Sequence, residues 1–393
     1  MQYRKDQYGN DLPILGFGCM RFPSSAGRID QKRTEALILR AVEGGVNYFD
    51  TAYIYPGSEN MLGEILQRHH LRQQVRIATK LPQTMCRGPE DFDAFFNTQK
   101  QRLRTDHIDY YLVHNITGLG QWEVLRQWGI EDWLEQKKSS GEIGQAGFSF
   151  HGAQQDFFRM LDSYHWDFVQ IQYNYMNTHF QAGTAGLRYA GEKNIPVFIM
   201  EPLLGGRLAS GLPKKAEAAL RQVRPDSTPA QWAFRWLWDQ SEVTLVLSGM
   251  NDSAQLEENL ALADASGSHM FSQEEHQAIA RVTEIFQESY KVPCTGCNYC
   301  MPCPQGLNIP ACFSAYNTSH AVGWFTGEFQ YCTLTGLTGA TPHLASDCTS
   351  CGTCERRCPQ GIQIRKELKR VRRRFECPGM KGLARGARWF LRR

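Results

Sequence analysis

Residues 75–114 contain the structural unit from which most of this chain is built. They open with the apolar run VRIATK (75–80), continue with the amphipathic run DFDAFFNTQKQRL (91–103) and close with a second apolar run, IDYYLVH (108–114). A short apolar run is typical of a buried strand, whereas apolar residues recurring every three to four positions are typical of a helix packed on a sheet. The stretch therefore predicts a strand–helix–strand unit with parallel strands.

The same alternation extends over about the first 265 residues. Eight apolar runs are predicted as strands: 15–20, 46–50, 75–80, 108–114, 143–149, 168–172, 196–200 and 243–247. The amphipathic stretches between them, predicted as helices, are 33–42, 91–103, 122–138, 153–161, 185–193, 229–238 and 254–263.

Eight strand–helix units over about 250 residues fit a (β/α)8 TIM barrel of the α/β class. A doubly wound sheet is the competing fold, and it usually carries a glycine-rich turn after its first strand. The sequence after Gly16-Phe17-Gly18 is no such turn. The polar opening at 3–12 is predicted to form a hairpin that closes the barrel floor.

The composition, 42% hydrophobic and 21% charged, is ordinary for a globular protein in water. No apolar run approaches the ~18–20 residues that a transmembrane helix needs, and MQYRKD at the start leads into no signal core. We therefore expect a cytoplasmic protein without a membrane span. From Gly361 onward twelve Lys or Arg stand against two Glu. This basic end suits an acidic protein, a membrane surface or nucleic acid, or it is simply solvated.

Cysteines divide the chain unevenly. Eleven of the thirteen lie between Cys294 and Cys377, and a disulfide scaffold is not expected in a reducing compartment. This change in composition predicts a domain boundary. We expect a barrel over 1–285, a mainly helical ferredoxin-like iron–sulfur domain over 286–376 and a basic tail over 377–393.

Two cysteine runs have the spacing of iron–sulfur ligands. The second run, Cys-x2-Cys-x2-Cys-x3-Cys-Pro, is that of bacterial ferredoxins, in which the fourth cysteine binds the other cluster. The first run is one residue shorter before its last cysteine. We predict two [4Fe–4S] clusters, one held by Cys294, Cys297, Cys300 and Cys358, and the other by Cys348, Cys351, Cys354 and Cys303. Tetrahedral zinc is the alternative, although zinc sites normally use cysteine pairs well separated in sequence.

Four polar residues at or just after predicted strand ends form a possible catalytic set: Asp50, Tyr55, Lys80 and His114. A carbonyl that receives a hydride needs a proton at oxygen, and a tyrosine hydroxyl can donate it if a buried lysine lowers its pKa. Asp50 would keep Lys80 charged and oriented, and His114 would hold the substrate oxygen or relay the proton. Taken singly, such residues usually have structural roles.

These residues resemble the aldo/keto reductase family, whose signature is Asp-Thr-Ala-x-x-Tyr followed by a lysine and then a histidine on the next two strands. The match includes Glu59 and Gly63, the run Gly147-Phe148-Ser149, the pattern Gln170-x-x-Tyr173-Asn174 and the pair Glu258-Asn259. It covers about residues 10–265. Because the cysteine domain follows this region, the chain is similar to those family members that carry a C-terminal ferredoxin-like domain.

The resemblance implies a nicotinamide cofactor bound across the barrel mouth. Ser149 and Gln170 match its carboxamide ligands, and Met200 stands where many members stack a tyrosine under the nicotinamide. Arg207, which follows two glycines, is positioned to contact the pyrophosphate.

On the adenosine side, Glu258 and Asn259 match residues that contact adenine. The positions that usually carry a lysine and an arginine for the 2′-phosphate align with Gly249 and Gln255. A phosphate prefers paired positive charge, so NADPH, NADH and no nicotinamide all stay open.

We therefore expect an oxidoreductase that transfers hydride to or from a small carbonyl or alcohol, with electron transfer through two clusters to or from a ferredoxin-type partner. A purely structural role, in which the clusters only brace the C-terminal domain, stays open. The alternative is a non-catalytic redox-sensing or interaction subunit built on a degenerate barrel. Nucleic-acid binding is disfavoured because no aromatic–basic strand motif accompanies the tail. The substrate and the oligomeric state stay undetermined.

Overall fold

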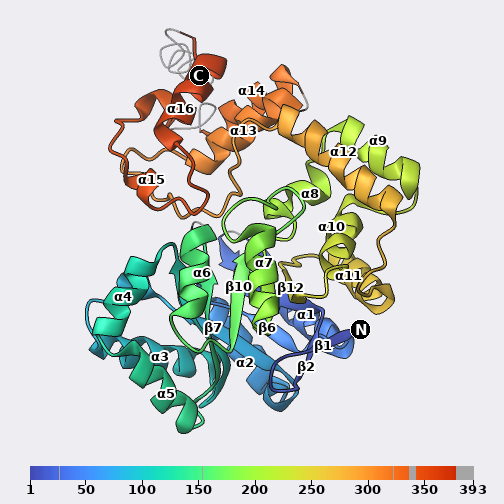
Figure 1. Ribbon diagram of the computed structural model, residues 1–393. Coiled ribbons are helices and arrows are strands. Elements are labelled where there is room, and N and C mark those ends of the chain that lie inside the picture. The colour runs from blue at the N-terminus through green and yellow to red at the C-terminus, as the bar shows by residue number, and fades with distance from the viewer. Residues whose placement is uncertain (26, 153, 322, 336–341, 378–393) are drawn as a thin grey trace. The chain divides into compact units, whose positions relative to one another are not determined.

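The computed structural model describes residues 1–377 except 26, 153, 322 and 336–341 (Figure 1). It contains two compact units, the first made of 1–203 and 230–272, and the second made of 204–229 and the chain from 273 onward. The predicted tail over 377–393 lies outside the described residues, apart from Cys377. Among the described residues, no helix has the length and apolar character needed to cross a membrane.

The first unit is a closed barrel of eight parallel strands, as predicted (Figure 1). In chain order the strands are β3 (Leu15–Gly18), β6 (Tyr48–Asp50), β7 (Arg76–Leu81), β8 (Ile108–Ile116), β9 (Ile143–Phe150), β10 (Phe168–Gln172), β11 (Val197–Met200) and β12 (Val243–Ser248). Each strand pairs with its neighbour in the chain, and β12 pairs with β3 to close the ring. All eight predicted strands are therefore present, with ends that differ from the predicted ones by at most two residues.

Helices between the strands complete this unit: α1 (Gln31–Glu43), α2 (Ser58–Arg68), α3 (Glu90–Leu103), α4 (Leu119–Gln127), α5 (Ile130–Ser139), α6 (Gln154–Asp162), α7 (Gly183–Glu192), α10 (Pro229–Trp238) and α11 (Ser253–Ala265). The prediction of one helix over 122–138 was wrong. Gly129 has a φ of +79°, a left-handed conformation that interrupts a right-handed helix, so the stretch is divided into α4 and α5.

A hairpin closes the barrel floor. Its strands are β1 (Tyr3–Lys5) and β2 (Asp11–Pro13), and their pairing is antiparallel. Leu12 is fully buried in a cluster of inward-facing strand residues that includes Tyr110 and Phe198. Asp6 accepts a hydrogen bond from the Tyr110 hydroxyl at 3.1 Å. Apolar contact and a buried hydrogen bond thus fix the hairpin to the barrel interior. A second small hairpin pairs β4 (Ser24–Ser25) with β5 (Arg28–Ile29).

The second unit is mainly helical (Figure 1). Its helices are α8 (Arg207–Ser210), α9 (Lys214–Val223), α12 (Gln273–Ser289), α13 (Ile309–Ala321), α14 (Trp324–Leu334), α15 (Thr353–Arg356) and α16 (Ile364–Phe375). Short 3-10 turns complete the chain at η1 (Cys19–Arg21), η2 (Arg72–Gln74), η3 (Gln83–Met85), η4 (Leu204–Gly206) and η5 (Ala345–Asp347).

The segment 204–229 follows strand β11 in sequence, yet it belongs to the same compact unit as the cysteine domain. Gly205, at a φ of +70°, lies so close to Thr295 that a Cβ on it would overlap the Thr295 carbonyl oxygen. Thr295 itself follows the first cysteine of the domain. The division into 1–285, 286–376 and 377–393 stays a prediction, because these compact units follow contacts rather than composition.

Two neighbouring glycines test this close contact. Gly205→Ala combines left-handed strain with an overlap, so we expect it to destabilise the second unit by roughly 2–4 kcal/mol. Gly206, at a φ of +96°, has no atom within 4 Å of its potential Cβ, so Gly206→Ala should cost only about 1 kcal/mol of strain. Chemical denaturation of both variants measures the difference. Equal losses of stability would contradict the proposed role of the Thr295 contact.

Candidate active site and cysteine clusters

Three of the four predicted catalytic side chains lie at the carboxyl ends of adjacent strands, where TIM-barrel active sites form. Asp50 is the last residue of β6, Lys80 is the fifth residue of β7, and His114 lies near the end of β8. Strand register pairs Asp50 with Ala78 and Lys80 with Leu112. Parallel pairing therefore brings residues that are 30 or more positions apart in sequence to one end of the barrel.

Lys80 and Asp50 form a buried ion pair. The Lys80 Nζ lies 2.7 Å from each carboxylate oxygen of Asp50 and 2.6 Å from the carbonyl oxygen of Thr51. The two side chains are 1% and 5% exposed. Burial raises the pKa of Asp50, while the Lys80 ammonium opposes that shift. Charges this deeply buried are retained only when their hydrogen bonds are satisfied.

Tyr55 lies beside this pair. It is half-buried in the loop between β6 and α2, its ring centroid is 5.4 Å from the Lys80 Nζ, and it is 6.1 Å from the His114 ring centroid. The loop is held by hydrogen bonds from the Tyr55 amide to the Ala52 carbonyl and from the Ser58 hydroxyl to the Cys19 carbonyl. The structure thus brings all four predicted residues together.

His114 is held in its neutral form. Burial is the main cause that lowers its pKa well below 6.5, and the nearby Lys80 and His151 lower it further. His151, which follows β9, is also buried, and burial lowers its pKa to about 4. Sequence reasoning missed His151; its position two residues after the predicted strand 143–149 was the available signal.

A second buried network supports Lys80 from behind. Glu59, at the start of α2, accepts hydrogen bonds from the Thr79 hydroxyl at 2.6 Å and from the Gln99 amide at 3.0 Å. Gln99 also donates to the Lys80 carbonyl at 3.0 Å, and Arg102 forms an ion pair with Glu59 at 3.0 Å. The network ties α2 and α3 to β7, so Glu59 has a structural role.

The two residues predicted at the carboxamide are direct neighbours. Ser149 on β9 pairs with Gln170 on β10, and both are almost fully buried. The Ser149 oxygen accepts a hydrogen bond from the Asn115 amide at 2.8 Å, which leaves its proton available for another acceptor. The Gln170 Oε1 is buried and has no hydrogen-bond partner among the described residues. One free donor and one free acceptor fit a primary carboxamide.

The remaining predicted cofactor residues are distributed over three elements. Met200 is half-buried at the end of β11. On α11, Asn259 is buried and donates to the Ser248 hydroxyl at 3.2 Å, Glu258 is half-buried, and Gln255 accepts from the Asn251 amide. Arg207 lies on α8 in the second unit, where its guanidinium is 5.3 Å from the ring centroid of Tyr290.

Sequence reasoning also missed a cation beside the loop after β12. The Nη2 of Arg33 lies 3.5 Å from the Asn251 carbonyl oxygen. Arg33 belongs to the first turn of α1, far from this loop in sequence, so only the closing of the barrel brings the two together.

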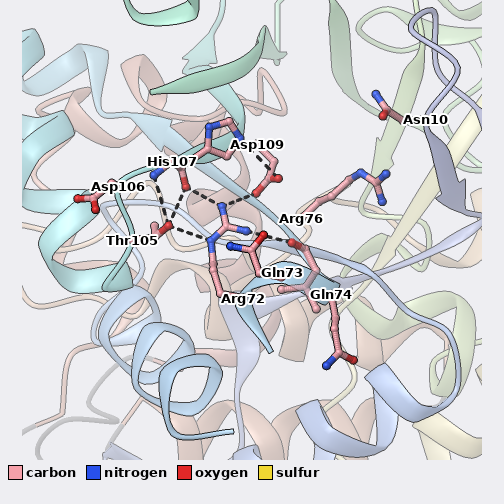
Figure 2. A pocket seen from close by; sticks show the side chains of 10 residues that line it. Asn10, Arg72, Gln73, Gln74, Arg76, Thr105, Asp106, His107 and Asp109 are labelled. Carbon is pink, nitrogen blue, oxygen red and sulfur yellow. Dashed lines mark hydrogen bonds and ion pairs between the residues drawn. The ribbon is translucent and has the colours of Figure 1, made fainter. Parts of the chain in front are cut away.

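A polar cavity of about 660 Å³ lies at the opposite, amino-terminal ends of β7 and β8 (Figure 2). Arg72 lies at its centre and donates to the carboxylate of Asp109 at 2.8 Å, to the His107 carbonyl at 2.7 Å and to the Thr105 hydroxyl at 2.9 Å. These groups satisfy one another, and the active sites of TIM-barrel enzymes lie at the carboxyl-terminal face of the strands rather than at this end. We therefore place the candidate active site at the other end.

The eight predicted cluster ligands fall into two groups. Cys294, Cys297, Cys300 and Cys358 line one pocket, and Cys303, Cys348, Cys351 and Cys354 line another. These are the two predicted sets, including the exchanged fourth cysteines. Burial raises the pKa of Cys300 to about 12, and Cys294, Cys297 and Cys358 contribute.

The three other cysteines of this domain lie outside these groups. Cys312 is fully buried in the domain core, Cys332 is half-buried and Cys377 is exposed. Among the described residues, no three His, Cys, Asp or Glu are close enough to hold a single metal ion. The four cysteines of each quartet instead line a common pocket.

Comparison with known proteins agrees with both halves of the chain. The aldo/keto reductase family profile matches residues 14–284, and a 4Fe-4S dicluster domain profile matches residues 293–363. The NADP(+) aldo-keto reductase yakc of Schizosaccharomyces pombe is 24% identical over 64% of this chain and 84% of its own length. Methylglyoxal reductase YeaE of Escherichia coli is 28% identical over 55% of this chain and 74% of its own length.

Solved structures agree on the fold. An aldo-keto reductase from Klebsiella pneumoniae in complex with NADPH superposes with a TM-score of 0.58 at 21% identity, covering 72% of this chain and 96% of its own. The two family profiles do not overlap, since the first ends at residue 284 and the second begins at residue 293. The chain therefore belongs to the aldo/keto reductase family and carries a 4Fe-4S domain after its barrel.

Proposed function

We propose that the chain is an oxidoreductase that transfers hydride between a nicotinamide cofactor and a small carbonyl or alcohol, with Tyr55 as the proton donor. The observation that carries the proposal is the buried Lys80–Asp50 ion pair beside Tyr55. A fixed positive charge in a water-poor site stabilises negative charge that develops next to it. That charge would develop on the phenol oxygen as its proton leaves.

The chain's own residues would divide the proton chemistry between them. Tyr55 gives its proton to the carbonyl oxygen, and the Lys80 ammonium stabilises the phenolate that results. Asp50 keeps Lys80 in place through two hydrogen bonds. Because the pKa of His114 is well below 6.5, its imidazole is neutral at pH 7, so it would orient the substrate oxygen by a hydrogen bond rather than act as the acid.

Ser149 and Gln170 would hold the nicotinamide, which when bound supplies or accepts the hydride. The free Ser149 proton would be donated to the carboxamide oxygen, and the unpartnered Gln170 Oε1 would accept from the carboxamide nitrogen. A buried acceptor without a partner costs about 1–3 kcal/mol, and a bound carboxamide would remove that cost.

The preference for NADPH would come from Arg33. Neither Gly249, in the loop after β12, nor Gln255, in the first turn of α11, supplies a cation, but Arg33 brings one to the Asn251 carbonyl of that loop. A guanidinium pairs well with a phosphate. The relative yakc is an NADP(+) aldo-keto reductase, and the Klebsiella structure is a complex with NADPH. Both support the same cofactor here.

The cysteine domain would hold two [4Fe–4S] clusters, one in each quartet, and transfer single electrons to or from a partner. Each quartet takes three ligands from one run and the fourth from the other, as two-cluster ferredoxin runs do. Thiolate-bound clusters persist in a reducing compartment, so a cytoplasmic location is part of this proposal.

Substitutions of two tyrosines in the loop between β6 and α2 test the catalytic proposal. Tyr55→Phe removes only the proposed proton donor, so we expect kcat for NADPH-dependent reduction of methylglyoxal to fall about 10²–10⁴-fold. Tyr53→Phe is the matched control, because Tyr53 packs against Phe95 and Arg102 and should keep near-normal activity. A Tyr55→Phe variant with unchanged kcat would contradict the role of Tyr55 as proton donor, whereas absence of carbonyl reduction in the unaltered protein would favour the non-catalytic subunit.

The cofactor proposal is tested on α1. Arg33→Ala should raise the KM for NADPH about tenfold, since a lost phosphate contact of this kind is worth roughly 1.4 kcal/mol. The KM for NADH should not change, and Lys32→Ala, which alters the exposed neighbouring residue, should affect neither. A parallel rise for both cofactors would show that Arg33 does not contact the 2′-phosphate.

The cluster proposal is tested by two cysteines of the second unit. Anaerobically purified protein should contain about eight irons and eight sulfides per chain. Cys303→Ala should reduce both to about four, because it removes a ligand of one cluster. Cys312→Ala, outside the quartets, should keep the full content. Zinc in place of iron, or unchanged content in Cys303→Ala, would contradict the assignment.

A further inference from the structure

Cys351 is the exposed member of the eight predicted ligands, and the other seven are buried or half-buried. Its quartet, which we call the outer quartet, consists of Cys303, Cys348, Cys351 and Cys354. An electron crosses protein only over short distances, so a cluster in this quartet would be the one within reach of a partner docked at the surface. This step rests on the proposed function, since it takes the outer quartet to hold a cluster.

Positive charge surrounds Cys351. A Cβ on Gly352, the next residue, would lie 3.6 Å from the Nη1 of Arg356 and 3.8 Å from the Cζ of Arg365. Arg365 also lines the space enclosed by the outer quartet. Two guanidinium groups therefore lie close to Gly352, the residue that follows the exposed ligand.

Helix α16 extends this charge away from the quartet. Its apolar residues Leu368, Val371 and Phe375 are buried in the core of the domain. Residues at i, i+4 and i+7 share one helix face, so Lys369 and Arg372 continue the row that begins with Arg365. Both are exposed, and neither has an ion-pair partner among the described residues.

Acidic side chains at this surface are few, and each has a hydrogen-bond or ion-pair partner. The described residues 342–377 contain four acidic residues, and none is exposed. Glu355 pairs with Arg365 at 2.6 Å and Glu367 pairs with Arg370 at 2.9 Å. Asp347 accepts from the Leu344 amide at 2.9 Å and Glu376 from the Ser346 amide at 3.1 Å. The cations that remain exposed are Arg356, Arg357, Arg365, Lys366, Lys369, Arg370, Arg372 and Arg373.

We propose that the surface formed by α15, α16 and the exposed edge of the outer quartet is the docking site for an acidic one-electron carrier protein. A positive surface around a redox centre steers a negative partner into short-range contact. If the outer quartet holds a cluster, a reduced carrier would give one electron to it in the oxidised state, which would leave the carrier oxidised by one electron and the cluster reduced by one. No bond forms or breaks in this step, and no proton is transferred.

Two other anionic partners fit the surface less well. A helix that binds a bilayer inserts its apolar face, whereas the apolar face of α16 is packed in the domain core. Single-stranded nucleic acid is held by exposed aromatic side chains, and the described residues 342–377 expose none. Neither partner needs access to a redox cluster, which the exposed Cys351 provides.

The test is stopped-flow reduction of the anaerobic holoprotein by an acidic flavodoxin in its hydroquinone state. We expect the second-order rate constant to fall roughly tenfold as ionic strength rises from about 0.02 M to 0.2 M. The double variant Lys369→Glu/Arg372→Glu should be roughly tenfold slower at low salt and should lose most of this salt dependence.

Lys214→Glu/Lys215→Glu is the matched control. It makes the same change in net charge on exposed residues of α9, at the end of the second unit away from α15 (Figure 1), and should remain within twofold of the unaltered protein. Iron content, reduction by reduced methyl viologen and NADPH-dependent activity should be unchanged in both double variants.

Equal slowing in the two double variants, or slowing in neither, would overturn the docking surface. So would loss of binding to anionic phospholipid vesicles or to single-stranded DNA in Lys369→Glu/Arg372→Glu while its electron-transfer rate stayed normal. Failure of the proposed function looks different, because it would appear in the unaltered protein as missing iron or as absent carbonyl reduction.

Discussion

The buried ion pair between Lys80 and Asp50 is the interaction on which the barrel mouth depends. Two charges with side chains 1% and 5% exposed are stable only while each satisfies the other. Strands β6 and β7 supply one partner each, and the Thr51 carbonyl and the network of Glu59 and Gln99 hold the lysine in place. Tyr55 gains a fixed positive neighbour from this arrangement, and the neutral His114 faces it.

Much of this arrangement could be predicted from sequence, because it repeats local patterns. Apolar runs located all eight strands, and helix 229–238 and strand 168–172 have the predicted ends. The break at Gly129 was missed because amphipathic periodicity continues through it. Arg33 was missed for another reason: closure of the barrel brings it to the Asn251 carbonyl, and nothing adjacent in sequence marks such a contact. His151 was missed although it closely follows a predicted strand. The cysteine quartets could be predicted because cluster ligands keep fixed spacings.

The second unit joins two features that are distant in sequence. The segment 204–229, which carries Arg207, packs with the cysteine domain, and Gly205 touches the carbonyl of Thr295 beside the first predicted cluster ligand. A predicted cofactor contact and a predicted cluster site therefore share one compact unit. The two quartets differ in exposure. Cys351 of the outer quartet is exposed beside a basic surface, whereas the thiols of the other quartet are buried or half-buried.

A chain with a hydride site and one-electron clusters can reduce a carbonyl by two routes, and the source of the new hydrogen separates them. The direct measurement is reduction of methylglyoxal with NADPH that carries deuterium at the transferable C4 position, followed by mass spectrometry of the alcohol. Hydride transfer at the Tyr55 site predicts one deuterium on the former carbonyl carbon. A product with hydrogen taken only from solvent would contradict this account, because it would assign the reduction to single electrons from the clusters.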